Sequence, residues 1–163
     1  MMTPTIGWRE WVALPELGVD AIKAKVDTGA RSSTLHAWAV EVVDHPHAGP
    51  VVRFVLHPHQ RDVSLTMAAD APLVGWRDVR SSNGTLERRP VIRTPVVIAG
   101  SRVPIELTLT RRDEMGFRML IGRLALRRRF VIDPARSFAG GGTTVAASSA
   151  SSRPLAGWVS AAR

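Results

Sequence analysis

The 163-residue sequence contains no cysteine and no tyrosine, and only two of its 22 basic residues are lysines. Without cysteine, the chain has no disulfide framework, no thiolate nucleophile and no thiolate metal ligand. This composition fits a reducing compartment, so we expect a cytoplasmic protein. The first 17 residues have no basic segment followed by an apolar run, which argues against a signal peptide. No uninterrupted apolar run reaches the length of a membrane helix, so we expect no membrane association.

Acidic residues are also scarce, and the formal net charge is +8. Arginine presents a planar fork of donors that binds carboxylates and phosphates bidentately. An anionic partner is therefore expected, which leaves nucleic acid and acidic peptide as candidates. Proteins that bind single-stranded nucleic acid usually place aromatic side chains among the basic ones along their strands. Here the Trp and Phe residues are scattered, which disfavours nucleic acid.

Short strand signals dominate the sequence. Residues 103–110, "VPIELTLT", alternate apolar and polar positions with a period of two, and 51–57, 63–67, 117–122 and 130–133 are further strand candidates. Residues 89–100 predict a bent strand or a pair of strands, and Pro95 favours an edge or a bulge. Residues 123–129, "RLALRRR", can form one or two helical turns. The pattern predicts a mostly β barrel or sandwich.

Two turns and a tail divide this pattern. Asn83-Gly84 is a strong signal for a β-hairpin, and 98–103 is a second candidate. From residue 139 the chain is rich in Gly, Ser and Ala and has no acidic residue. We therefore expect one domain over residues 1–138 and a flexible tail over 139–163.

The segment most suggestive of chemistry is "KAKVDTGARSST", residues 23–34. Asp27 follows a predicted strand and precedes Thr28 and Gly29, so a tight turn would present its carboxylate at the strand end. The Thr28 hydroxyl can bond back to the main chain and fix the loop. Three such residues alone also describe an ordinary turn. Ser32 and Ser33 then read as turn residues, and His36 as a packed or surface side chain.

Downstream, "MLIGR" at 119–123 supplies two apolar residues and then Gly122-Arg123. An apolar residue before Asp-Thr-Gly-Ala, paired with an apolar-apolar-Gly-Arg strand, resembles the retropepsin-like aspartic proteases. In that family the second segment supports the catalytic loop and precedes a short C-terminal helix. The Asn-Gly hairpin lies where those proteins carry a flap.

Four blocks, residues 7–37, 81–100, 105–123 and 130–138, together resemble one bacterial family. It is often labelled an ATP-dependent zinc protease, is also described as retropepsin-like, and occurs beside or fused to ATP-grasp glutamate ligases. The resemblance implies a closed retropepsin-like β-barrel with a short C-terminal helix. It implies an aspartic-type peptidase that hydrolyses amide bonds in glutamate-rich peptides or oligoglutamate-tagged proteins, in association with such a ligase. It also implies catalytic roles for Asp27, Thr28 and Gly29, and structural support from Gly122 and Arg123.

The residues themselves do not support the zinc or ATP parts of that label. There is no His-Glu-x-x-His pair, and the two His-Pro-His segments, 45–47 and 57–59, read as surface loops. The glycine-rich "AGGGTT" lacks the Lys-Ser/Thr of a nucleotide-binding loop. We therefore expect neither a metal nor another cofactor.

Aspartic protease chemistry requires two carboxylates that share one proton, whereas this chain has a single Asp-Thr-Gly. A homodimer would supply the second carboxylate by placing two copies of Asp27 at a two-fold axis. Asp113 or Glu114 within the same chain is the alternative. We favour the dimer.

Basic residues near the motif suggest what the site binds. Retropepsins usually carry Asp after Asp-Thr-Gly-Ala, whereas Arg31 follows Ala30 here, and Lys25 shares the face of Asp27 on the predicted strand. These cations disfavour a shared-proton dyad in the free protein, and an acidic substrate would neutralise them. The predicted substrate-binding residues are Lys25, Ala30, Arg31, Arg88, Arg111 and Arg112. A binding module for acidic peptides, without catalysis, remains the alternative.

Overall fold

The computed structural model describes residues 2–59, 64–80, 83–111 and 116–142, most of which form β-strands. The elements are β1 (Thr5–Ile6), β2 (Arg9–Leu14), a 3-10 turn (Pro15–Leu17), β3 (Val19–Asp27), β4 (Ser33–His36), β5 (Trp38–His45), β6 (Gly49–Leu56), β7 (Met67–Arg80), β8 (Leu86–Ile98), β9 (Ser101–Thr110), β10 (Met119–Gly122), α1 (Arg123–Leu126) and β11 (Val131–Ile132). The predicted mostly β class and the short helix are confirmed.

Six of the strands close into a barrel. The large sheet has the order β2-β3-β10-β4-β9-β8-β7-β6-β5, and pairing of Ala13 with Val97 joins β2 back to β8. Closure removes the free edges of those six strands, which is the usual solution for an antiparallel-rich sheet of this size. The retropepsin-like barrel predicted from the sequence is therefore confirmed.

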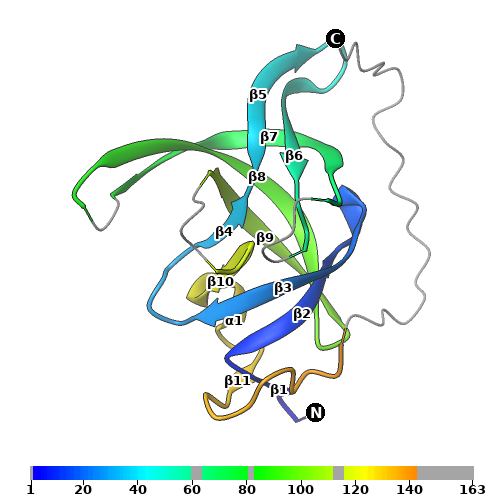
Figure 1. Ribbon diagram of the computed structural model, residues 1–163, viewed down its shortest axis with the longest axis vertical. Helices are drawn as coiled ribbons and strands as arrows, with labels where there is room; N and C mark the ends of the chain where they lie inside the picture. Colours follow the sequence, from blue (N-terminus) through cyan, green and yellow to red (C-terminus); the bar gives the residue numbers. More distant parts are fainter. Residues whose placement is uncertain (1, 60–63, 81–82, 112–115, 143–163) are drawn as a thin grey trace.

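The remaining strands extend from the barrel. β7 and β8 form a long hairpin that projects to one side, and β5 and β6 form a second hairpin that continues the sheet beyond β7 (Figure 1). The projecting tip and the loop that follows β3 lie on the same side of the barrel in that view. Within the hairpin turn, Gly84 has a φ of 83° and the Asn83 side chain accepts a hydrogen bond from the Thr85 N–H at 3.1 Å. The hairpin predicted from Asn83-Gly84 is confirmed.

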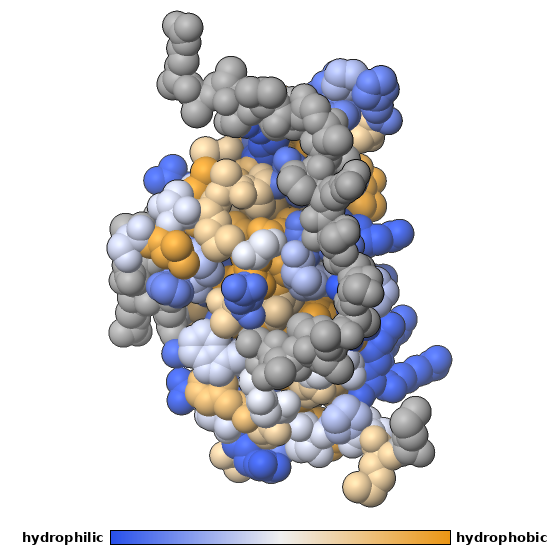
Figure 2. Space-filling view, turned by 90° about the vertical axis from the view of Figure 1, so that its right-hand side faces the viewer, coloured by the Kyte–Doolittle hydropathy of each residue, from blue (hydrophilic) through white to orange (hydrophobic). Residues whose placement is uncertain are grey.

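The barrel interior is apolar and follows the alternation of the strands. Val103, Ile105, Leu107 and Leu109 of β9 are all buried, as the period of two predicted. On β3, buried Ile22, Ala24 and Val26 alternate with more exposed neighbours. Figure 2 shows the surface of one face, where hydrophilic side chains project at the edges and hydrophobic residues lie between them.

Several local predictions hold and others need correction. The turn at Ala99-Gly100 has positive φ at both residues, 50° and 76°, as a two-residue type I′ hairpin requires. Residues 89–100 belong to one long strand and its turn, and at Pro95 this strand has lost β7 as a neighbour. The strand expected over 63–67 is wrong, because among its described residues only Met67 is in a strand.

The described chain ends in a segment that crosses the N-terminal strands. Glu10 is 1% exposed, and its carboxylate accepts hydrogen bonds from the Gly7 N–H at 3.0 Å and the Gly140 N–H at 2.7 Å. The Phe138 N–H bonds to the Arg9 carbonyl, and its ring stacks on Trp11. Of the tail predicted over 139–163, residues 143–163 lie outside the described residues. No helix in the described chain is long and apolar enough to span a bilayer.

Candidate active site

Asp27 is the last residue of β3, at the point where that strand leaves the barrel wall. β3 runs parallel to β10, with Val26 beside Ile121 and Asp27 beside Gly122. The two segments singled out by the sequence, "VDTGA" and "MLIGR", are therefore neighbours in space. Since Val26 and Ile121 are buried, the strand end is fixed by packing, while Asp27 itself remains partly exposed.

The loop after β3 folds around the Asp27 carboxylate. Its Oδ1 atom accepts hydrogen bonds from the Gly29 N–H at 3.0 Å and from the Ala30 N–H at 3.2 Å. A Cβ at position 29 would lie 3.2 Å from Oδ1, so glycine is favoured there by the close approach rather than by an unusual φ. No described residue donates to Oδ2, which leaves that oxygen available to a substrate or a water.

Thr28 departs from expectation. Its side chain is exposed, and it makes no hydrogen bond to the main chain in the described part of the protein. The two backbone amides fix the loop in its place. The loop tip, Thr28-Gly29, is exposed at the surface, and its bracing comes from hydrogen bonds of backbone groups rather than from the Thr28 hydroxyl.

Gly122, Arg123 and Ser33 hold the loop from behind. A Cβ on Gly122 would lie 2.5 Å from the Ser32 carbonyl oxygen, so only glycine allows the two backbones to approach this closely. The Ser33 hydroxyl accepts the Gly122 N–H at 3.1 Å. Arg123 bonds through its backbone N–H to the Ala30 carbonyl at 2.8 Å and through its guanidinium to the Gly29 carbonyl at 3.3 Å. This geometry is consistent with the support predicted for Gly122 and Arg123.

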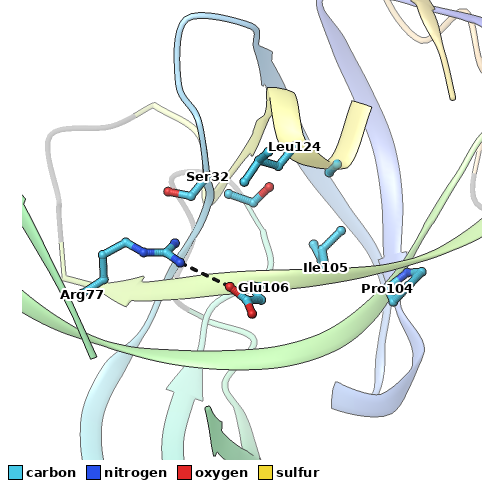
Figure 3. A pocket seen from close by; sticks show the side chains of 8 residues that line it. Ser32, Arg77, Pro104, Ile105, Glu106 and Leu124 are labelled. Atoms are coloured by element: carbon cyan, nitrogen blue, oxygen red, sulfur yellow. Dashed lines mark hydrogen bonds and ion pairs between the residues drawn. The ribbon is translucent and has the colours of Figure 1, made fainter. Parts of the chain in front are cut away.

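A cavity of about 130 Å³ lies against Ser32 and Ser33, where the loop after Asp27 leads into β4 (Figure 3). Ser32 and Ser33 form one wall, Leu124 and Ala125 of α1 another, and Ile105 and Glu106 of β9 a third. Arg77 reaches in from β7, the outer strand of the projecting hairpin, and pairs with Glu106 at 3.2 Å. The cavity thus joins the hairpin to the candidate catalytic loop.

The predicted substrate-binding cations are dispersed. Lys25 and Arg31 are exposed beside Asp27, and neither forms an ion pair with it. Arg88 lies on the hairpin with its guanidinium 5.1 Å from the centre of the Trp76 ring. Arg111 is exposed at the end of β9, and Arg112 lies outside the described residues.

The histidines are placed by packing and turns. His45 is 7% exposed, and its Nδ1 accepts the N–H groups of His47 and Ala48, both at 3.2 Å. The surface-loop reading of His45 was therefore wrong, because its ring caps the turn between β5 and β6. His36 is buried against Trp38, in agreement with a packed side chain. Among residues 2–59, 64–80, 83–111 and 116–142, no cluster of three or more His, Asp or Glu side chains could hold a metal ion.

Among the described residues, the hydrogen-bond donors to the Asp27 carboxylate are the backbone amides of Gly29 and Ala30. Asp113 and Glu114, the candidates within the chain, lie outside the described residues.

Sequence reasoning missed two groups of charged side chains, one across the adjacent strands β7, β8 and β9 and one within β8. Glu106 pairs with both Arg77 and Arg93, each at 3.2 Å. Arg89 is buried to 3% exposure, and its Nε bonds to Glu87 at 3.1 Å. Arg93 and Glu106 face one another across β8 and β9, so a correct strand register would have paired them. No local signal identifies Arg77 as their neighbour.

Residues 5–141 match a family model described as RimB-like, the retropepsin-like aspartic endopeptidase RimB. Three proteins named probable alpha-L-glutamate ligase are similar in sequence. The protein of Shewanella halifaxensis is 44% identical over 82% of this chain and 29% of its own length, that of Shewanella pealeana is 45% identical over the same shares, and that of Parasynechococcus marenigrum is 44% identical over 79% and 28%. The chain therefore spans less than a third of these relatives. A Legionella pneumophila protein of unknown function has a similar fold, with a TM-score of 0.67 over 85% of this chain and 99% of that one, at 24% identity.

Proposed function

This chain belongs to the RimB-like family of retropepsin-like aspartic endopeptidases, and we propose that it is an aspartic-type hydrolase of amide bonds in glutamate-rich peptides. The observation that carries the proposal is the Asp27 carboxylate. It stands at the end of a fixed strand, is oriented through Oδ1 by two backbone amides, and has Oδ2 free of the described residues. Hydrogen bonds that fix one oxygen leave the other in a defined position for proton transfer.

The reaction uses two carboxylates with different protonation. The ionised one takes a proton from a bound water as the water oxygen attacks the amide carbon, and the protonated one hydrogen-bonds to the carbonyl oxygen as charge develops there. Collapse of the tetrahedral intermediate breaks the C–N bond, and the leaving nitrogen takes a proton from the carboxyl groups. No covalent enzyme intermediate forms, and one water is consumed for each bond cleaved.

A second copy of the chain is proposed as the source of the second carboxylate. The exposed loop tip at Thr28-Gly29 supports this arrangement, since a two-fold axis through it would bring the same surface of each copy together. Mixing native chain with an excess of Asp27→Asn chain tests it. If both carboxylates come from a dimer, activity falls as native subunits are captured in mixed dimers; activity that stays proportional to native chain would indicate a partner carboxylate within the chain.

Glutamate-rich substrates are supported by charge and by the relatives. The chain has 22 basic residues against 14 acidic ones, and Lys25 and Arg31 flank Asp27 without pairing to it. Part of each of several proteins named probable alpha-L-glutamate ligase is similar to this chain. A hydrolase encoded beside or within such ligases would remove the residues that they add, and we propose association with an ATP-grasp ligase on that basis.

A second candidate, an acidic-peptide binding module without catalysis, is favoured by the single Asp-Thr-Gly of the sequence and by the exposed cations beside Asp27. Incubation with hexaglutamate distinguishes the two functions. The hydrolase proposal expects shorter products from the native chain, a rate at least about a hundredfold lower from Asp27→Asn, and native-like cleavage by Asp20→Asn. The last variant is a control that removes an exposed carboxylate from the same strand. Binding of hexaglutamate with no products from the native chain would favour the module instead.

A further inference from the structure

Glu106 lies between two arginines that differ in what else they touch. Its Oε2 contacts Arg77 at 3.2 Å and its Oε1 contacts Arg93 at 3.2 Å, so each oxygen receives one guanidinium nitrogen rather than a bidentate pair. A guanidinium has five N–H donors, and each ion pair uses only part of them. Each guanidinium therefore keeps unused donors for a further anion.

Only one of the two arginines faces the cavity beside the catalytic loop. Arg77 lines that cavity together with Ser32, Glu106 and Leu124, as Figure 3 shows, whereas Arg93 does not line it. The Arg77 side chain is 38% exposed and that of Arg93 is 65% exposed. Arg77 is consequently the more desolvated and better oriented of the two, which increases the strength of its hydrogen bonds to an anion.

The residues that follow the candidate catalytic loop in the sequence form part of the cavity wall. Ser32 lies five residues beyond Asp27 along the sequence, and the adjacent Ser33 bonds to Gly122, the register partner of Asp27. The opposite wall, β7, belongs to the projecting hairpin. A peptide held between that hairpin and the loop would therefore direct a side chain into this cavity.

We infer that this cavity is a specificity subsite for an acidic side chain of the substrate, with Arg77 as the cation that recognises it. The inference rests on the proposed function and adds to it the residue that selects glutamate. Glu106 positions the guanidinium, and the Ser32 hydroxyl supplies a second donor at the cavity wall. A volume of about 130 Å³ suits one side chain rather than a large ligand.

The test is peptide binding measured by fluorescence anisotropy in the Asp27→Asn background, where turnover cannot complicate it. Arg77→Gln should weaken labelled hexaglutamate binding about tenfold to a hundredfold, the loss expected for one charged hydrogen-bonding partner. Arg93→Gln is the matched control, because it removes the same charge from the same glutamate outside the cavity. It should change the affinity less than about threefold, as expected for an exposed pair.

Peptides with a single Glu→Gln replacement at each position refine the test. At one position of the peptide, the Glu→Gln replacement should weaken binding to the Arg93→Gln chain. The same replacement should not weaken binding to the Arg77→Gln chain, because the arginine that recognises that glutamate is already absent. Equal weakening by the two arginine variants would mean a general charge effect and would overturn the subsite. Such a result would refute the subsite but not the hydrolase, because the native chain could still cleave the peptide. Unchanged cleavage by Asp27→Asn would instead refute the hydrolase, and the binding test of the subsite would still be valid. Thermal unfolding of both variants checks that the fold is retained.

Discussion

Replacing Gly122 with alanine should separate the support of the catalytic loop from the stability of the barrel. The new Cβ would lie 2.5 Å from the Ser32 carbonyl oxygen, 2.6 Å from its carbon and 2.9 Å from the Arg31 carbonyl carbon. All three are backbone atoms, so no side-chain rotation relieves the contact. Reaching an ordinary separation of 3.4 Å requires the 31–32 backbone to move by close to 1 Å.

That displacement has two measurable consequences. Overpacking of this kind typically costs about 1–3 kcal/mol, so the free energy of unfolding in urea should fall by that amount. A shift of about 1 Å in a loop that holds a catalytic group can slow a reaction about a hundredfold, so kcat/KM for hexaglutamate should fall by about that factor. Activity should therefore fall further than stability alone explains.

Gly75→Ala is the matched control. Nothing lies within 4 Å of a Cβ built at that position in β7, and its φ is not in the left-handed region. The free energy of unfolding should stay unchanged or rise by up to about 1 kcal/mol. If Gly122→Ala is as stable and as active as Gly75→Ala, the reasoning about the loop's support is refuted.

Two further predictions concern side chains that fix backbone segments. Glu10→Ala should lower the free energy of unfolding by about 2–4 kcal/mol, because the amides of Gly7 and Gly140 lose their buried acceptor. It should also speed proteolysis of the C-terminal segment; equal rates of proteolysis in the native chain and the variant would contradict the prediction. Arg123→Met should leave the melting temperature within a few degrees of native but reduce kcat, since the Gly29 carbonyl loses its exposed donor. An unchanged kcat would mean that the Arg123 side chain does not support the loop, leaving only its backbone N–H, which bonds to Ala30.

The strand pattern predicted a mostly β barrel or sandwich, and the resemblance to retropepsin-like proteases predicted the closed barrel and the pairing of residues 26–30 with 119–123. Alternation along 103–110 identified β9. Gly29 stands where the backbone approaches the Asp27 carboxylate, and Gly122 where it approaches the backbone of Ser32. These features are encoded locally, either by a period of two or by the absence of a side chain, and such signals survive without knowledge of the tertiary structure.

The missed features depend on strand order. β4 was not predicted because Ser33, its first residue, was interpreted as part of a turn. β5 and most of β7 were not predicted because exposed valines and a tryptophan interrupt the alternation that would reveal a half-buried strand. Arg77 and Glu106 are brought together only when β7, β8 and β9 are adjacent. His45 looked like a loop histidine because its proline neighbour signals a turn, and the burial of its ring follows from packing that the sequence does not display.

The most direct test of the central claim is the rate at which hexaglutamate is hydrolysed by the native chain and by Asp27→Asn, each with and without a metal chelator. The account predicts cleavage by the native chain that the chelator does not reduce. It also predicts a loss of about 10²–10⁴-fold in Asp27→Asn, the range expected when a general base is removed. Cleavage by Asp27→Asn at the native rate, or cleavage that the chelator abolishes, would contradict it.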